Sequence, residues 1–243
     1  MALPILETAK YELTLPSTDF KVSYRPFLVK EEKLLMMALE SGENSQITKA
    51  LKEIVQICTF NTVNVEALPT FDIEYIFLNI RAKSVGEIAK LKIKCPDDKE
   101  TYANVEVDLS KVEVQVDDKH SNEIQVNDKI KFVMKYPTLD TFDPNMDAGN
   151  MKTEQLFDVI ANTIYEIYEG DTVHKASDYT KEEMLKFIES LTSADFAKIQ
   201  EFYQTMPRLA HEIEVTNPKT KKVSKVMLSG LNAFFQSPSP MTT

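Results

Sequence analysis

The clearest chemical pattern in this sequence is a proline turn that occurs twice. Cys95-Pro96-Asp97-Asp98 and Asn217-Pro218-Lys219-Thr220 each follow an alternation of apolar residues that is typical of a strand. A zinc knuckle has this outline, with a thiolate at the first and fourth positions, so that two turns complete a tetrahedral site. Here Asp98, Asn217 and Thr220 occupy three of those four positions. One thiolate cannot hold such an ion, so we expect zinc-ribbon-like hairpins that bind no metal.

The surroundings of the two turns also match each other. A shift of 122 residues aligns residues 91–96 with 213–218, and it places Val105 on Met227 and Leu109 on Leu231. Each segment then consists of a strand, a proline turn, a second strand and a leucine, close to a group of helices. The pattern favours a degenerate internal repeat of two helix-plus-hairpin halves, although a match this short also arises by chance.

Other residues that could do chemistry are isolated from one another. His120, His174 and His211 each lie near acids, but none has a second histidine or a serine nucleophile in a recognisable arrangement. We therefore expect them at the surface or at helix caps. The acids between Asp140 and Gly149 lack the ligand spacing of a calcium loop, so this segment is expected to be a plain loop.

Glycine and cysteine usage argues against a metabolic enzyme. The chain has five glycines in 243 residues and contains none of the motifs G-x-G-x-x-G, G-x-x-x-x-G-K-[ST] or G-x-S-x-G. Its two cysteines, Cys58 and Cys95, show no reason to pair, which is typical of a reducing compartment. The sequence also shows neither a signal peptide nor a long apolar segment. We expect a cytoplasmic, soluble protein without catalytic residues, cofactor or metal.

The negative charge of the chain, −10 in total, is concentrated in one window. Ten acids lie there: Asp97, Asp98, Glu100, Glu106, Asp108, Glu113, Asp117, Asp118, Glu123 and Asp128. Three lysines lie in the same window, so its net charge is 3 − 10 = −7. An acidic chain is a poor nucleic-acid binder. The window is either a solvated face or a patch that steers a basic partner, for which Asp97, Asp98, Asp117 and Asp118 are the candidates.

A carboxylate-dependent hydrolase is a further alternative, and it would need paired carboxylates in a cleft with shifted pKa values.

Two aromatic segments are further candidates for partner contacts. Arg25 and Phe27 flank Pro26 at the end of a strand, and an arginine beside aromatics is a common interface composition. Phe234 and Phe235 are adjacent near the end of the chain. We expect one of these two to be a core residue and the other to be free to contact a partner.

The periodicity of apolar residues predicts an α+β fold. Residues 1–82 are expected to form a β-hairpin at 11–29 followed by three helices, at about 34–42, 45–58 and after Pro69. Residues 83–136 are expected to form an acidic antiparallel β module, with strands at 88–95, 102–109, 112–116 and 130–136. Frequent breakers in 137–150 predict a linker.

A second group of helices is expected in residues 151–236, followed by a hairpin. The first helix is predicted at about 156–170 and the second after a capping box at Thr180 and Glu183. The third is predicted to stop at Pro207, before strands at 213–215 and 223–228. Residues 237–243 are expected to be a frayed tail.

Several segments resemble the baseplate hub proteins of T-even-type bacteriophages. They are residues 20–33, 68–87, 179–183, 206–212 and 230–235. The resemblance implies a tail baseplate hub subunit or a hub assembly chaperone that acts by protein–protein contact and not by catalysis. The implied partners are other phage hub or tail proteins, or further copies of this chain, with neither nucleic acid nor membrane. The implied location is the host cytoplasm during assembly, or the baseplate of the virion as a permanent structural subunit.

Overall fold

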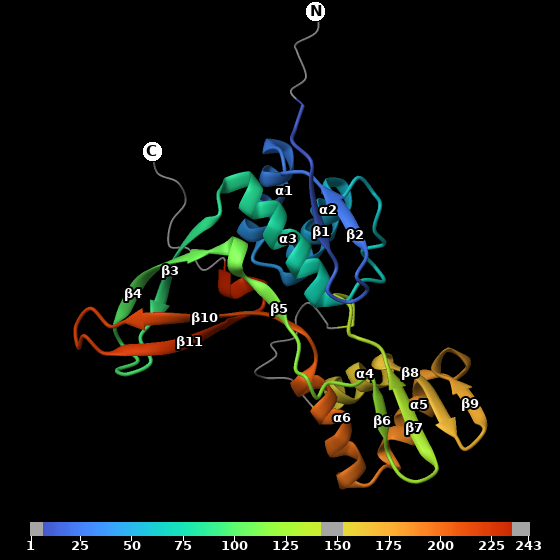
Figure 1. The fold of residues 1–243 in the computed structure, drawn as a ribbon. Helices are drawn as coiled ribbons and strands as arrows, with labels where there is room; N and C mark the ends of the chain where they lie inside the picture. The colour runs from blue at the N-terminus through green and yellow to red at the C-terminus, as the bar shows by residue number, and fades with distance from the viewer. Residues whose placement is uncertain (1–6, 142–152, 235–243) are drawn as a thin grey trace, which may run out of the picture. The chain divides into compact units, whose positions relative to one another are not determined.

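The computed structural model describes residues 7–141 and 153–234, and these residues form the expected α+β fold. Their helices are α1 (Val29–Ser41), α2 (Asn44–Cys58), α3 (Thr70–Val85), α4 (Thr153–Thr163), α5 (Lys181–Glu189) and α6 (Ser193–Thr205). Three 3-10 turns accompany them: η1 (Leu109–Lys111), η2 (Ala176–Asp178) and η3 (Leu231–Phe234). Figure 1 shows these elements along the chain.

The described strands pair antiparallel in four small sheets. The strands are β1 (Tyr11–Thr14), β2 (Lys21–Tyr24), β3 (Ile88–Lys94), β4 (Tyr102–Asp108), β5 (Glu113–Gln115), β6 (Glu123–Gln125), β7 (Ile130–Met134), β8 (Ile164–Glu169), β9 (Thr172–Lys175), β10 (Arg208–Thr216) and β11 (Val223–Ser229). The sheet orders are β1-β2, β3-β4, β11-β10-β5 and β6-β7-β8-β9. Small antiparallel sheets joined by short turns match the alternating patterns read from the sequence.

The chain forms two compact units, and neither is a single continuous stretch of sequence. Among the described residues, unit 1 contains 7–42, 49–115 and 208–234, and unit 2 contains 43–48, 116–141 and 153–207. The strands within 83–136 are therefore distributed: β3 pairs with β4, β5 joins β10, and β6 and β7 belong to unit 2. The segment boundaries at 82, 136, 150 and 236 divide the chain linearly and stay a prediction.

Unit 1 is built around α3, which is buried on nearly every side. Its buried residues are Phe71, Asp72, Ile73, Ile76, Phe77, Leu78, Ile80 and Ala82. The helix begins after Pro69, whose fixed φ suits a helix start, and it ends at Gly86. Asp72 accepts hydrogen bonds from the backbone N–H and the hydroxyl of Ser17, which lies in the β1–β2 turn. These two hydrogen bonds offset the free-energy cost of burying the Asp72 carboxylate.

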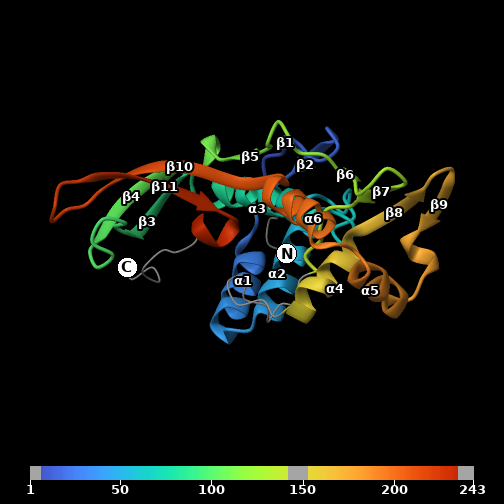
Figure 2. The ribbon, with the colours of Figure 1, turned by 90° about the horizontal axis from the view of Figure 1, so that it is seen from below.

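The two proline-turn hairpins share one hydrophobic core with α3. Alternate residues of β3 are buried, and Ala89, Leu91 and Ile93 pack in the same cluster as Ile213 and Val215 of β10. Figures 1 and 2 both show the β3–β4 hairpin lying alongside the β10–β11 hairpin. The strict alternation fixes the register, because a slip of one residue would turn every buried side chain outward.

Unit 2 places its helices against the sheet β6-β7-β8-β9. Its core joins Ile124, Phe132 and Ile167 of the strands to Ile160, Ile188 and Ile199 of the helices. The expected helix at 156–170 is wrong in its second half, because α4 ends at Thr163 and β8 begins at Ile164. The strand pairs with β7 along its length and turns into β9 at Gly170, which has a φ of 56°. The helical spacing of Ile160, Ile164 and Ile167 favours a helix. The hydrogen bonds of β8 with its neighbouring strands stabilise a strand instead, because tertiary contacts override local preference.

Most predicted helix boundaries are confirmed. Gly42 takes a left-handed φ of 67° at the end of α1, and α6 ends before Pro207. The capping box at the start of α5 is present, with Thr180 Oγ1 accepting from Glu183 N–H and the Glu183 carboxylate accepting from Thr180 N–H. These ends follow from local sequence because the bonds that form them are local.

The packing of unit 1 predicts unequal effects for two identical substitutions. Phe234 is 0% exposed in the core cluster, whereas Phe20 is 56% exposed. We expect Phe234→Ala to lower the free energy of unfolding by roughly 3–5 kcal/mol, because it leaves a cavity. Phe20→Ala should change it by less than about 0.5 kcal/mol. Chemical denaturation followed by circular dichroism measures both, and equal losses would contradict this assignment of the core.

Candidate functional site

Arg25, a candidate for a partner contact, is buried in an ion pair. Its Nη2 lies 3.0 Å from Glu31 Oε1, and its Nη1 donates to the carbonyl of Pro26 at 2.8 Å. Burial acts to raise the pKa of Glu31, but the hydrogen bonds from Arg25 and from Leu28 N–H hold it below its ordinary value. Glu31 thereby joins Arg25 to the first turn of α1. The guanidinium therefore stabilises the start of α1.

The aromatic candidates differ in exposure. Phe27 is half-buried, and its backbone N–H donates to Ser84 Oγ at 2.9 Å. Phe234 is a core residue of unit 1, as expected for one member of the adjacent pair. Phe235, and the tail 237–243, lie outside the described residues.

Asp97 and Asp98 lie in the turn between β3 and β4, where both carboxylates are hydrogen-bonded. Asp97 accepts from Asn217 Nδ2 at 2.8 Å and from Thr220 Oγ1 at 2.5 Å, and both donors come from the turn between β10 and β11. These bonds hold the pKa of Asp97 below its usual range. Asp98 accepts from the hydroxyl and N–H of Thr101 and from Glu100 N–H, which also lowers its pKa. Both residues therefore stabilise turns as carboxylates.

Asp117 and Asp118 are the two acidic candidates that are exposed. Asp117 Oδ1 accepts from Lys119 N–H at 2.9 Å, which stabilises the loop before β6. The acidic window is shared between the units: residues 97–115 carry 2 − 6 = −4, and residues 116–128 carry 1 − 4 = −3. The negative charge of the window is thus divided between the two units, a division that the linear sequence does not show.

His120 is part of the packing of unit 2. Its Nδ1 lies 2.9 Å from Thr205 Oγ1 and its Nε2 lies 3.1 Å from Tyr136 Oη. Burial lowers the pKa of the imidazole, and the ring stacks on Tyr136. The expectation of a surface or cap position is refined here, since the ring is half-buried and joins three segments.

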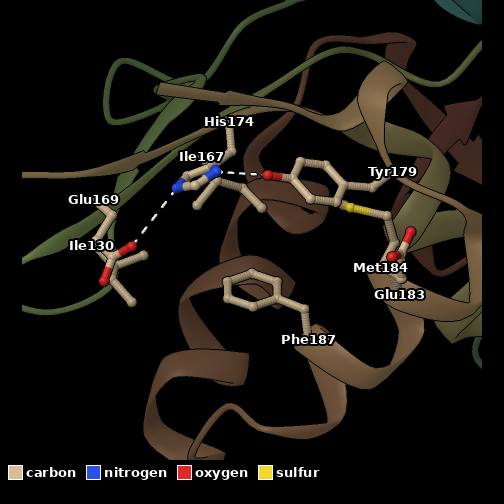
Figure 3. Close-up of a pocket in the computed structure, with 8 residues that line it drawn as sticks. All are labelled: Ile130, Ile167, Glu169, His174, Tyr179, Glu183, Met184 and Phe187. Atoms are coloured by element: carbon tan, nitrogen blue, oxygen red, sulfur yellow. Dashed lines mark hydrogen bonds and ion pairs between the residues drawn. The ribbon is translucent and has the colours of Figure 1, made fainter. Parts of the chain in front are cut away.

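Unit 2 contains a cavity of about 360 Å³ between its sheet and α5. It is lined by Ile130, Ile167, Glu169, His174, Tyr179, Glu183, Met184 and Phe187. In Figure 3, the imidazole of His174 lies between Tyr179 and Glu169, with Nδ1 2.7 Å from Tyr179 Oη and Nε2 3.6 Å from Glu169 Oε2. Four of the lining side chains are apolar and four are polar, so the cavity could hold a ligand with both apolar and polar groups.

This cavity was not expected from the sequence. The helix predicted through residue 170 would have removed β8, which carries Ile167 and Glu169. A usable signal was present: Ile164, Tyr165, Ile167 and Tyr168 favour a strand, and Gly170-Asp171 favours a tight turn.

Glu74 of unit 1 has a strongly raised pKa. Burial raises its pKa to about 7, and the N–H of Leu231, which donates to Oε1 at 3.0 Å, acts in the opposite direction. Gly230, just before η3, has a φ of 71°, and a Cβ there would lie 3.5 Å from Glu74 Oε1. The carboxyl group therefore holds the last described turn of the chain, η3, against α3.

The described residues show neither of two common functional features. In 7–141 and 153–234, no three histidine, cysteine or acidic side chains gather as potential metal ligands. No helix within those same ranges has the length and apolar character needed to cross a bilayer.

The fold and these sites define an α+β protein whose polar clusters connect turns, helix ends and hairpins. The chain belongs to the family described as T4 bacteriophage base plate protein, which it matches over residues 8–236. The resemblance found in its sequence is thereby confirmed at the level of the phage baseplate family. Comparisons with curated proteins and with solved structures gave no match.

The raised pKa of Glu74 predicts a pH-dependent stability. In the unfolded chain the carboxyl titrates near 4.5, and in the folded chain near 7. Between these values the folded state binds the extra proton, so stability falls as pH rises. The full shift amounts to about 3 kcal/mol at most.

Glu74→Gln removes this titration. We expect the free energy of unfolding of the variant, relative to the native chain, to increase by up to about 3 kcal/mol between pH 4.5 and 8. Glu40→Gln, at an exposed position of α1, is the matched control. Denaturant titrations at several pH values measure the difference, and identical pH profiles for the native chain and Glu74→Gln would contradict the role of this carboxyl.

Proposed function

We propose that this baseplate-family protein acts in assembly of the tail baseplate hub by binding other hub or tail proteins, without catalysis. It would do so in the host cytoplasm. Membership of the baseplate family supports a structural or assembly role. The finer role rests on the surface chemistry of unit 1.

The observation that carries the proposal is the apolar surface of α1. Val29, Met36, Met37 and Leu39 are all more than half exposed, while the helix buries only Glu31 and Ala38 fully. Leaving such side chains in water costs free energy, and clusters of them are typical of protein–protein interfaces. Methionine is well suited to this role because its flexible thioether adapts to the shape of a partner. We therefore assign α1 as the principal binding surface.

The acidic window favours binding over hydrolysis. A general acid needs a carboxyl with a raised pKa, but hydrogen bonds from turn residues lower the pKa of Asp97, Asp98 and Asp108. Glu106 and Glu123 pair with Lys90 and Lys131 on exposed strands. These groups act as fixed negative charges, and the carboxylate hydrolase is the weaker alternative.

A permanent structural subunit of the virion is the second candidate function. Quantitative mass spectrometry of purified particles separates the two, because a subunit is present in a fixed ratio to other baseplate proteins and an assembly factor is not. Particles that assemble normally without this protein would contradict both.

The binding surface on α1 predicts a specific loss of partners. We expect Met36→Glu combined with Met37→Glu to reduce the recovery of baseplate or tail proteins, captured from infected cells and identified by mass spectrometry, at least tenfold. Tenfold corresponds to about 1.4 kcal/mol. Met227→Glu is the matched control, since Met227 is 47% exposed on β11 and Met36 is 51% exposed. Equal recovery with both variants, at unchanged circular dichroism, would contradict the assignment.

Steering by the exposed acids predicts an effect on association rate. We expect Asp118→Lys to slow association with the captured partner and to weaken its dependence on salt, because rim charges act mainly on the association rate. Glu214→Lys, at an exposed position of β10, is the control with the same change of charge. Stopped-flow or surface-binding kinetics at two salt concentrations measure the rates. An unchanged association rate for Asp118→Lys would contradict a role of Asp118 in attracting the partner.

A further inference from the structure

The two proline turns of unit 1 begin in the same way and differ in length by one residue. In the β3–β4 turn, Cys95 N–H donates to the carbonyl of Thr101 at 2.8 Å, and Lys99 N–H donates to the carbonyl of Cys95 at 3.0 Å. In the β10–β11 turn, Asn217 N–H donates to the carbonyl of Lys222 at 2.9 Å, and Lys221 N–H donates to the carbonyl of Asn217 at 2.9 Å.

The backbone angles agree as well. Lys99 and Lys221, which follow their prolines at the same offset, both have a left-handed φ, of 56° and 62°. Few non-glycine residues adopt this conformation, so its occurrence at equivalent positions is specific. The sequence shift of 122 residues thus aligns residues 95–99 with 217–221 in backbone conformation, and the β3–β4 turn then has one residue more before its second strand.

The equivalent turns also meet each other. Asp97 of the first turn accepts from the Asn217 amide at 2.8 Å and from the Thr220 hydroxyl at 2.5 Å. Asn217 and Cys95 are each only 1% exposed. The first and fourth positions of both turns are 95, 98, 217 and 220, which is the spacing of the four thiolates in a two-hairpin zinc site.

The side chains at these positions do not suit a metal. Only Cys95 has sulfur, and burial, with Asp97 and Asp98 nearby, raises the pKa of its thiol, so that the thiolate needed for coordination is disfavoured. Both carboxylate oxygens of Asp97 already accept hydrogen bonds. Asn217 Oδ1 accepts from the N–H groups of Lys219 and Thr220, at 2.8 and 3.2 Å.

We propose that Asp97, Asn217 and Thr220 form a metal-free clasp that joins the two hairpins where a four-thiolate zinc ion joins them in a zinc ribbon. The clasp replaces metal–sulfur bonds by hydrogen bonds to one carboxylate. On this proposal the two hairpins of unit 1 are held together without zinc. The inference is separate from the proposed function, since it concerns how the two hairpins are held.

The sharpest test restores the thiolates. The variant Asp98→Cys/Asn217→Cys/Thr220→Cys, together with the native Cys95, offers four sulfurs at the required spacing. We expect the full-length variant to bind one Zn²⁺ per chain by elemental analysis, and to show the visible bands of tetrahedral cobalt–thiolate coordination when Co²⁺ is added instead. Zinc should raise its Tm and EDTA should lower it, whereas the native chain should hold no zinc and respond to neither.

A register control makes the result specific. Lys99→Cys in place of Asp98→Cys gives the same number of sulfurs with one residue too many between them, and we expect it to bind zinc at least tenfold more weakly. Stoichiometric zinc in the native chain would overturn the proposal. A folded triple variant that binds no zinc, or binds it no better than the register control, would do so too.

A second variant tests the clasp if the triple variant does not fold. We expect Asp97→Ala to lower the Tm by on the order of 3 °C and to increase amide exchange in both turns, including the turn that does not contain residue 97. Asp118→Ala, at an exposed loop position, is the control. An Asp97→Ala chain with unchanged Tm and unchanged exchange in residues 217–222 would overturn the clasp.

Discussion

Unit 1 depends on the burial of α3, a helix that is surrounded by other segments, so that several of its polar groups are paired with distant parts of the chain. Asp72 accepts from Ser17, Glu74 accepts from Leu231, and Ser84 accepts from the N–H of Phe27. Each bond satisfies a buried group that would otherwise cost free energy, and each also fixes a segment far away in the sequence. One helix thus places the first hairpin, the segment before α1, and the last described turn around a single core.

The same requirement distinguishes the interior of unit 1 from the exposed side chains of α1. Ionic groups that face the interior of unit 1, such as Arg25 and Glu31, are matched to each other. On α1, by contrast, the side chains of Val29, Met36 and Met37 are exposed within the part of the chain that the structure describes. Exposed apolar side chains on a helix suit a protein–protein contact, which is the role proposed above for α1. For a member of a phage baseplate family, this agrees with a role in assembly.

Local patterns predicted most elements because local bonds form them. The capping box of α5, Gly42 at the end of α1 and the alternation in β3 each involve residues a few positions apart. The prediction failed where a distant partner decides. Residues 164–169 have helical spacing, but β7 and β9 supply hydrogen bonds to both edges of this strand, so it extends the sheet and creates the cavity around His174. The sequence predicted that one of Phe234 and Phe235 is a core residue without saying which, and packing places Phe234 in the core.

The sequence by itself determined the α+β class, the baseplate resemblance and the presence of sulfur at only one of the first and fourth positions of the two proline turns. These are properties of composition and short-range spacing, which need no knowledge of long-range contacts. The tertiary structure alone decided that Asp97 lies against Asn217 and Thr220, more than a hundred residues away, and that the acidic window is shared between two units. The reason is physical: a carboxylate in a turn can be solvated, paired or bonded to another turn, and only the packing of the two hairpins brings its donors within hydrogen-bonding distance.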